Sequence, residues 1–305
     1  MAFDLKSNDL TIGSLCALGC EVLYGMSYIF TKQATQNASA LSLLGWRFLL
    51  AFVVMSILAV TGVIKVHLRG RNIIPLFLVA LFSPVLYFIG ETFGISNTTA
   101  SESGVFLACI PVASLIASTL ILKKKPKKIQ IIGILITLAG VLMTVFAVGA
   151  SSSLSITGYA FLLMAVISYA LYCVFVDRAD GYGGTEITYM MIVAGAVVFV
   201  ILAMVEGIVK GNLGQIAVLP FSDMGFLISV LYQGIGCSIL AFFLSNHAIA
   251  KIGVNRTSSF IGVATVVSIV AGALLLKEPF TIWQVIGAAV IIIGVYTANT
   301  HQKTT

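Results

Sequence analysis

Long apolar runs separated by short polar connections are the feature that most restricts the fold of this chain. Each run is about 20 residues long, the length that a helix needs to cross the hydrocarbon core of a bilayer. The ten runs lie at 10–31, 41–62, 73–95, 101–122, 129–149, 154–176, 186–209, 223–248, 256–276 and 281–299. Charged residues make up only 9% of the sequence, whereas soluble domains carry about 25%. We therefore expect an all-α integral membrane protein with ten transmembrane helices, and we exclude a soluble globule.

The chain repeats one pattern of Pro, Gln and Gly about 153 residues further on. The matching pairs are Pro126 with Pro279, Gln130 with Gln284, Gly133 with Gly287, and Gly140 with Gly294. The first spans also match, because LYGMSYIFTKQA (23–34) aligns with SYALYCVFVDRA (168–179). We interpret the chain as a duplicated unit, with one five-helix domain at 1–150 and a second at 151–305.

The number of spans in each half predicts how the halves are related. A unit with five spans enters the membrane from opposite sides in its two copies, so we expect an inverted repeat, as in many secondary transporters. With this topology, 13 of the 17 Lys and Arg residues lie on the side of the N-terminus, among them the five lysines of 123–128. Because positively charged loops stay in the cytoplasm, we place both termini there, in a bacterial inner (plasma) membrane.

The basic loop and the cysteines have plain explanations. The lysines of 123–128 lie between two spans, so they favour anionic lipid head groups over a nucleic-acid partner. All five cysteines fall in apolar runs without a CxxC motif, which is typical of small buried residues. There is no P-loop, no clustered metal-ligand set and no Ser–His–Asp arrangement. We therefore expect no enzyme activity, no cofactor and no metal.

Charged residues inside the spans are the first candidates for function, because they are costly in a bilayer. Glu21 lies near the middle of the first span. It could couple transport to protons or bind a cationic group, or it could be a protonated side chain that hydrogen-bonds a neighbouring helix. Arg47 lies in the second span, and we expect a structural ion pair with Glu91 or Glu102. The acid left unpaired would belong to an outer vestibule.

Tyrosines recur in the same spans. Tyr24 and Tyr28 are four residues apart and share one helix face with Glu21. An aromatic wall with hydroxyl groups suits an amphipathic substrate and can hold a cation, although packing or interfacial tyrosines are an open alternative. The candidates for substrate binding or coupling are Glu21, Tyr24, Tyr28, Tyr87, Glu91, Tyr169, Tyr172, Tyr232 and Gln233.

Helix-breaking residues interrupt three of the spans. Pro84 lies in span three, Pro111 in span four, and Gly234 with Gly236 in span eight. Such breaks free backbone carbonyls for water or substrate and permit hinging. A tolerated kink without function explains them equally well.

These features together resemble the EamA type of the drug/metabolite transporter superfamily. The resemblance rests on ten spans in two halves, the Pro-bearing fourth span, YGMSYIFTK (24–32), WRFLLA (46–51) and LLLKEPFTIWQVIGAAVIIIGV (274–295). It implies a central cavity lined by spans one, three, four, six, eight and nine, with alternating access. It also implies that small metabolites such as amino acids or related amines are moved, mostly by export.

The acid-rich first half favours substrates with a positive group, and protons or the substrate's own gradient would supply the energy. The alternative functions are a non-transporting membrane enzyme and a lipid-binding scaffold. A channel is disfavoured, because the sequence has no ring of repeated acids. Monomer and homodimer both stay open.

Overall fold

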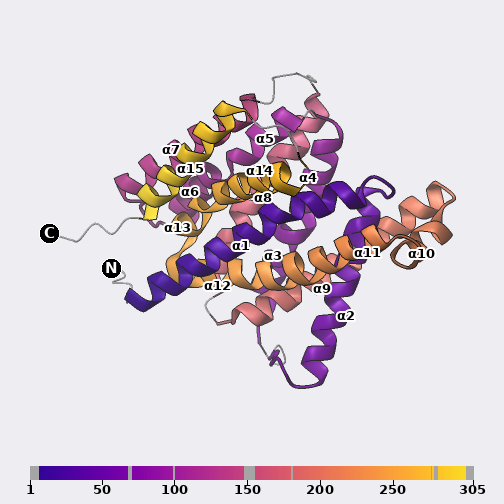
Figure 1. The fold of residues 1–305 in the computed structure, drawn as a ribbon. Coiled ribbons are helices and arrows are strands. Elements are labelled where there is room, and N and C mark those ends of the chain that lie inside the picture. Colours follow the sequence, from indigo (N-terminus) through magenta and orange to yellow (C-terminus); the bar gives the residue numbers. More distant parts are fainter. Residues whose placement is uncertain are drawn as a thin grey trace.

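A computed structural model describes residues 7–67, 71–98, 100–147, 155–179, 181–275, 277 and 281–299. Every regular element within these ranges is a helix, and the helices pack side by side in one bundle (Figure 1). Nine helical segments among the described residues are long and apolar enough to cross a membrane. The beginning of α1 (Ser7–Ala34) and the end of α15 (Ile282–Asn299) lie at the same end of the bundle.

The helical segments divide between the two halves of the sequence. The first half continues after α1 with α2 (Ala40–Val60), α3 (Ile74–Ala80), the π-helical η1 (Leu81–Leu86), α4 (Tyr87–Ser96), α5 (Ala100–Ala108), α6 (Ile110–Ile121) and α7 (Lys128–Ala147). The second half has α8 (Ile156–Arg178), α9 (Gly184–Val209), α10 (Leu213–Ser222), α11 (Met224–Leu231), the π-helical η2 (Tyr232–Ala241), α12 (Phe242–Ile252), α13 (Val254–Ser259), α14 (Ile261–Leu275) and α15.

Nine of the ten predicted spans coincide with the long apolar segments. The run 101–122 is instead divided between α5 and α6, and Pro111 lies in the first turn of α6. Proline has no amide hydrogen and its ring crowds the preceding turn, so it is tolerated at a helix start and not in an interior. The short helix α10 was not expected, because 210–222 lies between the predicted spans 186–209 and 223–248, where the sequence indicates a connection. It is held against α2 by a hydrogen bond from Trp46 Nε1 to the Ile216 carbonyl, 2.8 Å long.

The interruptions predicted in spans three, four and eight are present as η1, the α5–α6 junction and η2. A fourth interruption separates α13 from α14 at Phe260, and neither Pro nor Gly signals it. Here the Ser258 and Ser259 hydroxyls donate hydrogen bonds to carbonyls three residues earlier, at 3.4 and 2.7 Å. Such side-chain bonds compete with the regular helical pattern, which explains why a scan for Pro and Gly missed this break.

Helices from the two halves pack against each other in matched pairs. α7 packs on α15, and α2 packs on α9. The pairs α4 with α8 and α1 with α12 correspond to each other when the halves are exchanged, as do α6 with α8 and α1 with α14. The bundle is therefore built from two copies of one packing pattern, and its core is shared between the halves.

The repeated glycines lie at the closest of these contacts, between α7 and α15 (Figure 1, upper left). A Cβ atom on Gly133 would lie 2.3 Å from the Ala298 amide nitrogen, and one on Gly140 would lie 2.8 Å from the Gly287 carbonyl oxygen. No side chain fits at such distances. The glycines serve close helix packing, as the sequence predicts.

Candidate functional site

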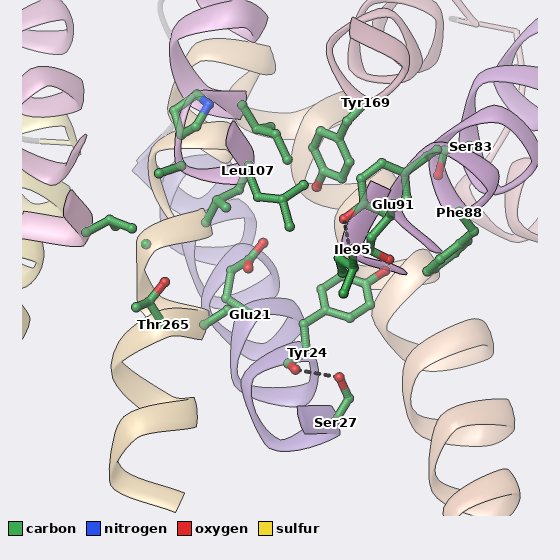
Figure 2. Close-up of a pocket in the computed structure, with 18 of the residues that line it drawn as sticks. Glu21, Tyr24, Ser27, Ser83, Phe88, Glu91, Ile95, Leu107, Tyr169 and Thr265 are labelled. Carbon is green, nitrogen blue, oxygen red and sulfur yellow. Dashed lines mark hydrogen bonds between the residues drawn. The ribbon is translucent and has the colours of Figure 1, made fainter. Parts of the chain in front are cut away.

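A cavity of about 480 Å³ lies between the two halves (Figure 2). Its size is typical of small-molecule sites. The lining comes from spans one, three, four, six, eight and nine, as the resemblance implied, and also from α2 and α7. On α1 the lining residues run from Glu21 to Thr31, in the part of the helix that ends at Ala34. The cavity therefore extends from the middle of the bundle towards the end where α1 finishes.

All four interrupted spans contribute lining residues at their breaks. Ser83 belongs to η1, Pro111 to the start of α6, Gln233 to η2 and Ile261 to the start of α14. Inside a bilayer, backbone that departs from the α-helix is tolerated only where protein or a water-filled cavity satisfies its polar groups. The breaks thus concentrate backbone polar groups around this one space.

Glu21 projects from α1 into the cavity (Figure 2). Its side chain is only 5% exposed. Among the described side chains, none donates a hydrogen bond to this carboxyl group and no cation lies within ion-pair distance of it. A buried carboxylate without a partner is energetically costly, and Glu21 faces the cavity, where water, a proton or an entering cation can reach it.

A second carboxyl group lies on the opposite wall. Glu91 of α4 accepts a hydrogen bond of 2.7 Å from the Tyr87 hydroxyl, one helical turn earlier (Figure 2). The Tyr87 ring also meets Tyr169 of α8 edge-on, with 5.4 Å between ring centroids. Tyr24 of α1 lines the same space. Two acidic groups and three tyrosine rings therefore share one cavity.

Arg47 is the cation of this site. It is 5% exposed and lines the cavity from α2. Its Nε donates to Ser238 Oγ (2.6 Å) and its Nη1 to Gln233 Oε1 (2.9 Å). The predicted ion pair with Glu91 is absent from the described part of the chain, since Glu91 bonds Tyr87 instead. The side chain of Glu102, the other expected partner, lies outside the described residues.

Two of the predicted site residues with described side chains, Tyr172 and Tyr232, do not line this cavity. Tyr172 is buried, and its hydroxyl donates to Asn246 Oδ1 at 2.8 Å in the contact between α8 and α12. Tyr232 stacks on Phe30 with 4.0 Å between centroids, and its hydroxyl donates to a backbone carbonyl of α1. The side chain of Tyr28 lies outside the described residues. The periodicity used for the prediction does not tell which side of a fully buried helix faces the cavity.

The remaining predicted residues line the cavity, namely Glu21, Tyr24, Tyr87, Glu91, Tyr169 and Gln233. Sequence reasoning missed a set of hydroxyl groups that also line it, from Ser27, Thr31, Ser83, Thr137 and Thr265. A signal for two of them was present. Ser27 and Thr31 follow Glu21 and Tyr24 at spacings that keep all four on one side of a helix.

Comparison with known proteins gives the family. The sequence profile of the family described as "EamA-like transporter family" matches residues 11–146 and again 156–300. "Uncharacterized transporter YcxC" of Bacillus subtilis (strain 168) is 30% identical over 301 residues, which cover 98% of this chain and 96% of that protein. "Probable amino-acid metabolite efflux pump" of Salmonella typhimurium (strain LT2) is 22% identical, with 92% of each chain covered.

The fold has a counterpart among solved structures. One crystal structure superposes with a TM-score of 0.74 at 16% sequence identity, over 96% of this chain and 98% of the other. At that identity the similarity concerns the fold. The two profile matches and the 30% identical relative decide the family. This chain is an integral membrane transporter and belongs to the EamA-like transporter family of the drug/metabolite transporter superfamily.

Proposed function

We propose that the protein is a secondary active transporter that exports small metabolites, amino acids or related amines, in exchange for protons. The observation that carries this proposal is the buried, unpartnered Glu21 on the wall of a cavity that both halves enclose. A carboxyl group in that position can hold either a proton or the ammonium group of a substrate. If the carboxyl group holds only one of them at a time, binding of a proton releases the substrate and binding of the substrate releases the proton, which is the simplest basis for exchange. The name of the Salmonella relative, an amino-acid metabolite efflux pump, supports the same substrate class.

The proposed topology has ten spans, with α5 and α6 together as the fourth. The halves, 1–150 and 151–305, are inverted, and both termini are cytoplasmic, in a bacterial inner membrane. The matched packing of the helix pairs and the positions of Lys and Arg support this arrangement. The Bacillus relatives support the bacterial membrane. One chain encloses the cavity, so a monomer suffices for the proposal and a homodimer is compatible with it.

Alternating access would use the two ends of the bundle in turn. The cavity extends towards the end where α1 finishes, which the proposed topology places outside. At the other end, three ion pairs join the first half to the second, one of them between Arg71 Nη1 and Glu186 Oε1 at 3.1 Å. Lys124 Nζ binds both carboxylate oxygens of Asp177 at 2.9 and 2.7 Å, and Lys251 binds Asp9. Partly exposed pairs of this kind contribute about 0.2–1 kcal/mol each, weak enough to break and reform in every cycle.

The cavity walls supply the contacts that an ammonium substrate requires. Glu91, already bonded to the Tyr87 hydroxyl, offers a second carboxyl group for the positive charge. The rings of Tyr24, Tyr87 and Tyr169 can stabilise the same charge through their faces. The proposal includes no nucleic-acid partner, and the partners besides the substrate are protons and the surrounding membrane lipid.

Transport in proteoliposomes tests the function. Purified protein is reconstituted in vesicles with an acidic lumen, and uptake is screened over radiolabelled amino acids and amines. We expect uptake of one class to rise when the pH gradient is imposed, because protons leave as substrate enters. In Glu21→Gln that stimulation should disappear, while exchange of labelled for unlabelled substrate persists.

Glu206→Gln is the matched control. Glu206 lies at the end of α9 and binds Lys210 and Ser39, away from the cavity. This variant should keep its response to the pH gradient. A Glu21→Gln protein that retains full stimulation would refute the coupling role, and vesicles that move none of the probes would refute the proposed substrate class.

A further inference from the structure

Arg47 has a donor that nothing in the described structure uses. Its Nη2 atom is buried and has no hydrogen-bond partner, although Nε and Nη1 are both bonded. The guanidinium group lies 4.8 Å from the centre of the Phe88 ring and 5.3 Å from that of Phe48. The group is thus held from several sides, while one buried nitrogen with two N–H bonds has no acceptor, in a residue that lines the cavity.

Arg47 also forms no ion pair among the described residues. Its hydrogen-bond partners, Ser238 and Gln233, are neutral, and no described carboxylate lies within ion-pair distance of it. The guanidinium group of arginine carries a positive charge. A buried charge without a counter-charge is strongly unfavourable. An anionic group that enters the cavity would relieve this cost.

The neighbours of Arg47 fix its direction. Gln233 accepts from Nη1 and donates from its own Nε2 to Thr31 Oγ1, 2.7 Å away on α1. Ser238 holds Nε from the same helical segment, η2. Because η2 holds the side chain directly and α1 holds Gln233, the guanidinium group is positioned before any ligand arrives. Such preorganisation favours binding, since less conformational entropy is lost when the ligand binds.

We propose that Arg47 is the residue that recognises the carboxylate of the transported molecule. This inference rests on the proposed function and extends it, because it adds a requirement for a negative group on the substrate. Guanidinium binds carboxylate through short, charge-assisted hydrogen bonds. With the acidic Glu21 and Glu91 lining the same cavity, the site then fits a zwitterion, whose ammonium group faces the acids while its carboxylate meets Arg47. Simple amines lack the second contact and are poorer substrates.

A matched set of probes separates the two charges. Uptake into proteoliposomes is measured for L-leucine, L-phenylalanine and L-threonine, for the amide of each, and for the amine that remains when the carboxylate is removed. A charged hydrogen-bond pair corresponds to about a tenfold to hundredfold preference. We expect the wild-type protein to favour each transported amino acid over its amide and amine by that factor in kcat/KM.

Three variants test whether Arg47 causes the preference for the amino acid over its amide. In Arg47→Gln the ratio of acid to amide should fall to about one, by loss of acid transport with amide transport retained. In Arg47→Lys, which keeps the charge without the planar fork, the ratio should be intermediate. Arg178→Gln removes an exposed arginine outside the cavity lining and should leave the ratio unchanged. Thermal unfolding and gel filtration in detergent establish that each variant is folded.

The outcomes are distinct. Wild-type protein that carries acid and amide equally well overturns the role of Arg47 and leaves the transport function intact, whether or not Arg47→Gln folds. An unchanged ratio in a folded Arg47→Gln protein overturns it as well. If the wild-type protein moves none of the probes, both this inference and the proposed substrate class fail.

Discussion

The hydroxyl of Tyr172 provides a sharp test of the buried structure, because sequence reasoning assigned this residue to the substrate site and the structure places it elsewhere. The hydroxyl donates to Asn246 Oδ1 at 2.8 Å and lies 3.1 Å from Ser245 Oγ. Asn246 is completely buried, and its Nδ2 atom is bonded to Thr188 Oγ1 at 3.0 Å. The tyrosine thus completes a polar network that joins α8, α9 and α12.

The substitution Tyr172→Phe removes the donor and leaves Asn246 Oδ1 buried without a partner. Such a loss costs about 1–3 kcal/mol. With about 2–4 °C for each kcal/mol in a chain of this order of size, the Tm should fall by about 2–12 °C. The five free cysteines, three of them buried, allow unfolding to be followed with a thiol-reactive fluorophore in detergent.

Tyr169→Phe is the matched control, because it makes the same change on the same helix at a residue that lines the cavity. No hydrogen bond of the Tyr169 hydroxyl is present in the described structure, so its Tm should change by about 1 °C or less. The Tyr169→Phe substitution should instead change transport, because Tyr169 lines the cavity. A Tyr172→Phe protein with unchanged Tm and a raised KM would show that the hydroxyl faces the substrate and that the network described above is wrong.

Two further predictions concern packing and pH. Gly294→Ala would place a Cβ atom 2.5 and 2.8 Å from backbone atoms of α7, so we expect about 1–3 kcal/mol of destabilisation, measured as a lower Tm. Gly214→Ala, which meets no atom within 4 Å, should be neutral or slightly stabilising. Hydrogen bonds, chiefly from the Phe226 amide, lower the pKa of Asp223. The stability that Asp223 contributes is therefore present above its unfolded pKa of about 3.9 and is lost as the pH falls through the lower folded value. The Tm difference between wild type and Asp223→Asn should shrink below about pH 4. A Tm difference that stays constant with pH would contradict this assignment.

The location of the broken helices was only partly predictable. Pro84 and Pro111 signal their interruptions because proline cannot continue an α-helix from its interior. The break at Phe260 comes from serine hydroxyls that bond the backbone, and serine is common enough in spans that its presence alone predicts nothing. Only the folded arrangement shows that all four breaks line the same cavity.

Arg47 and Glu91 illustrate the same limit for charges. Both are charged side chains within spans, which are energetically costly in a bilayer and are therefore candidates for function. Their opposite charges suggest that they pair. In the structure Glu91 accepts a hydrogen bond from Tyr87, one turn away on its own helix, and Arg47 donates hydrogen bonds to η2 of the other half. Partner choice depends on which helices become neighbours, and that information is absent from the spacing of residues along one span.

Local chemistry therefore determined the class of this protein. Runs of about 20 apolar residues can bury their backbone polar groups in a bilayer only as helices, and the repeated Gly, Gln and Pro mark a duplicated unit. Those features depend on short stretches of sequence, so the sequence alone reveals them. The tertiary structure decided which side chains face the cavity. It brought Glu21 and Glu91 to one space, placed Tyr172 in a buried network and left Arg47 Nη2 without a hydrogen-bond partner among the described residues, because these outcomes depend on contacts between helices far apart in the chain.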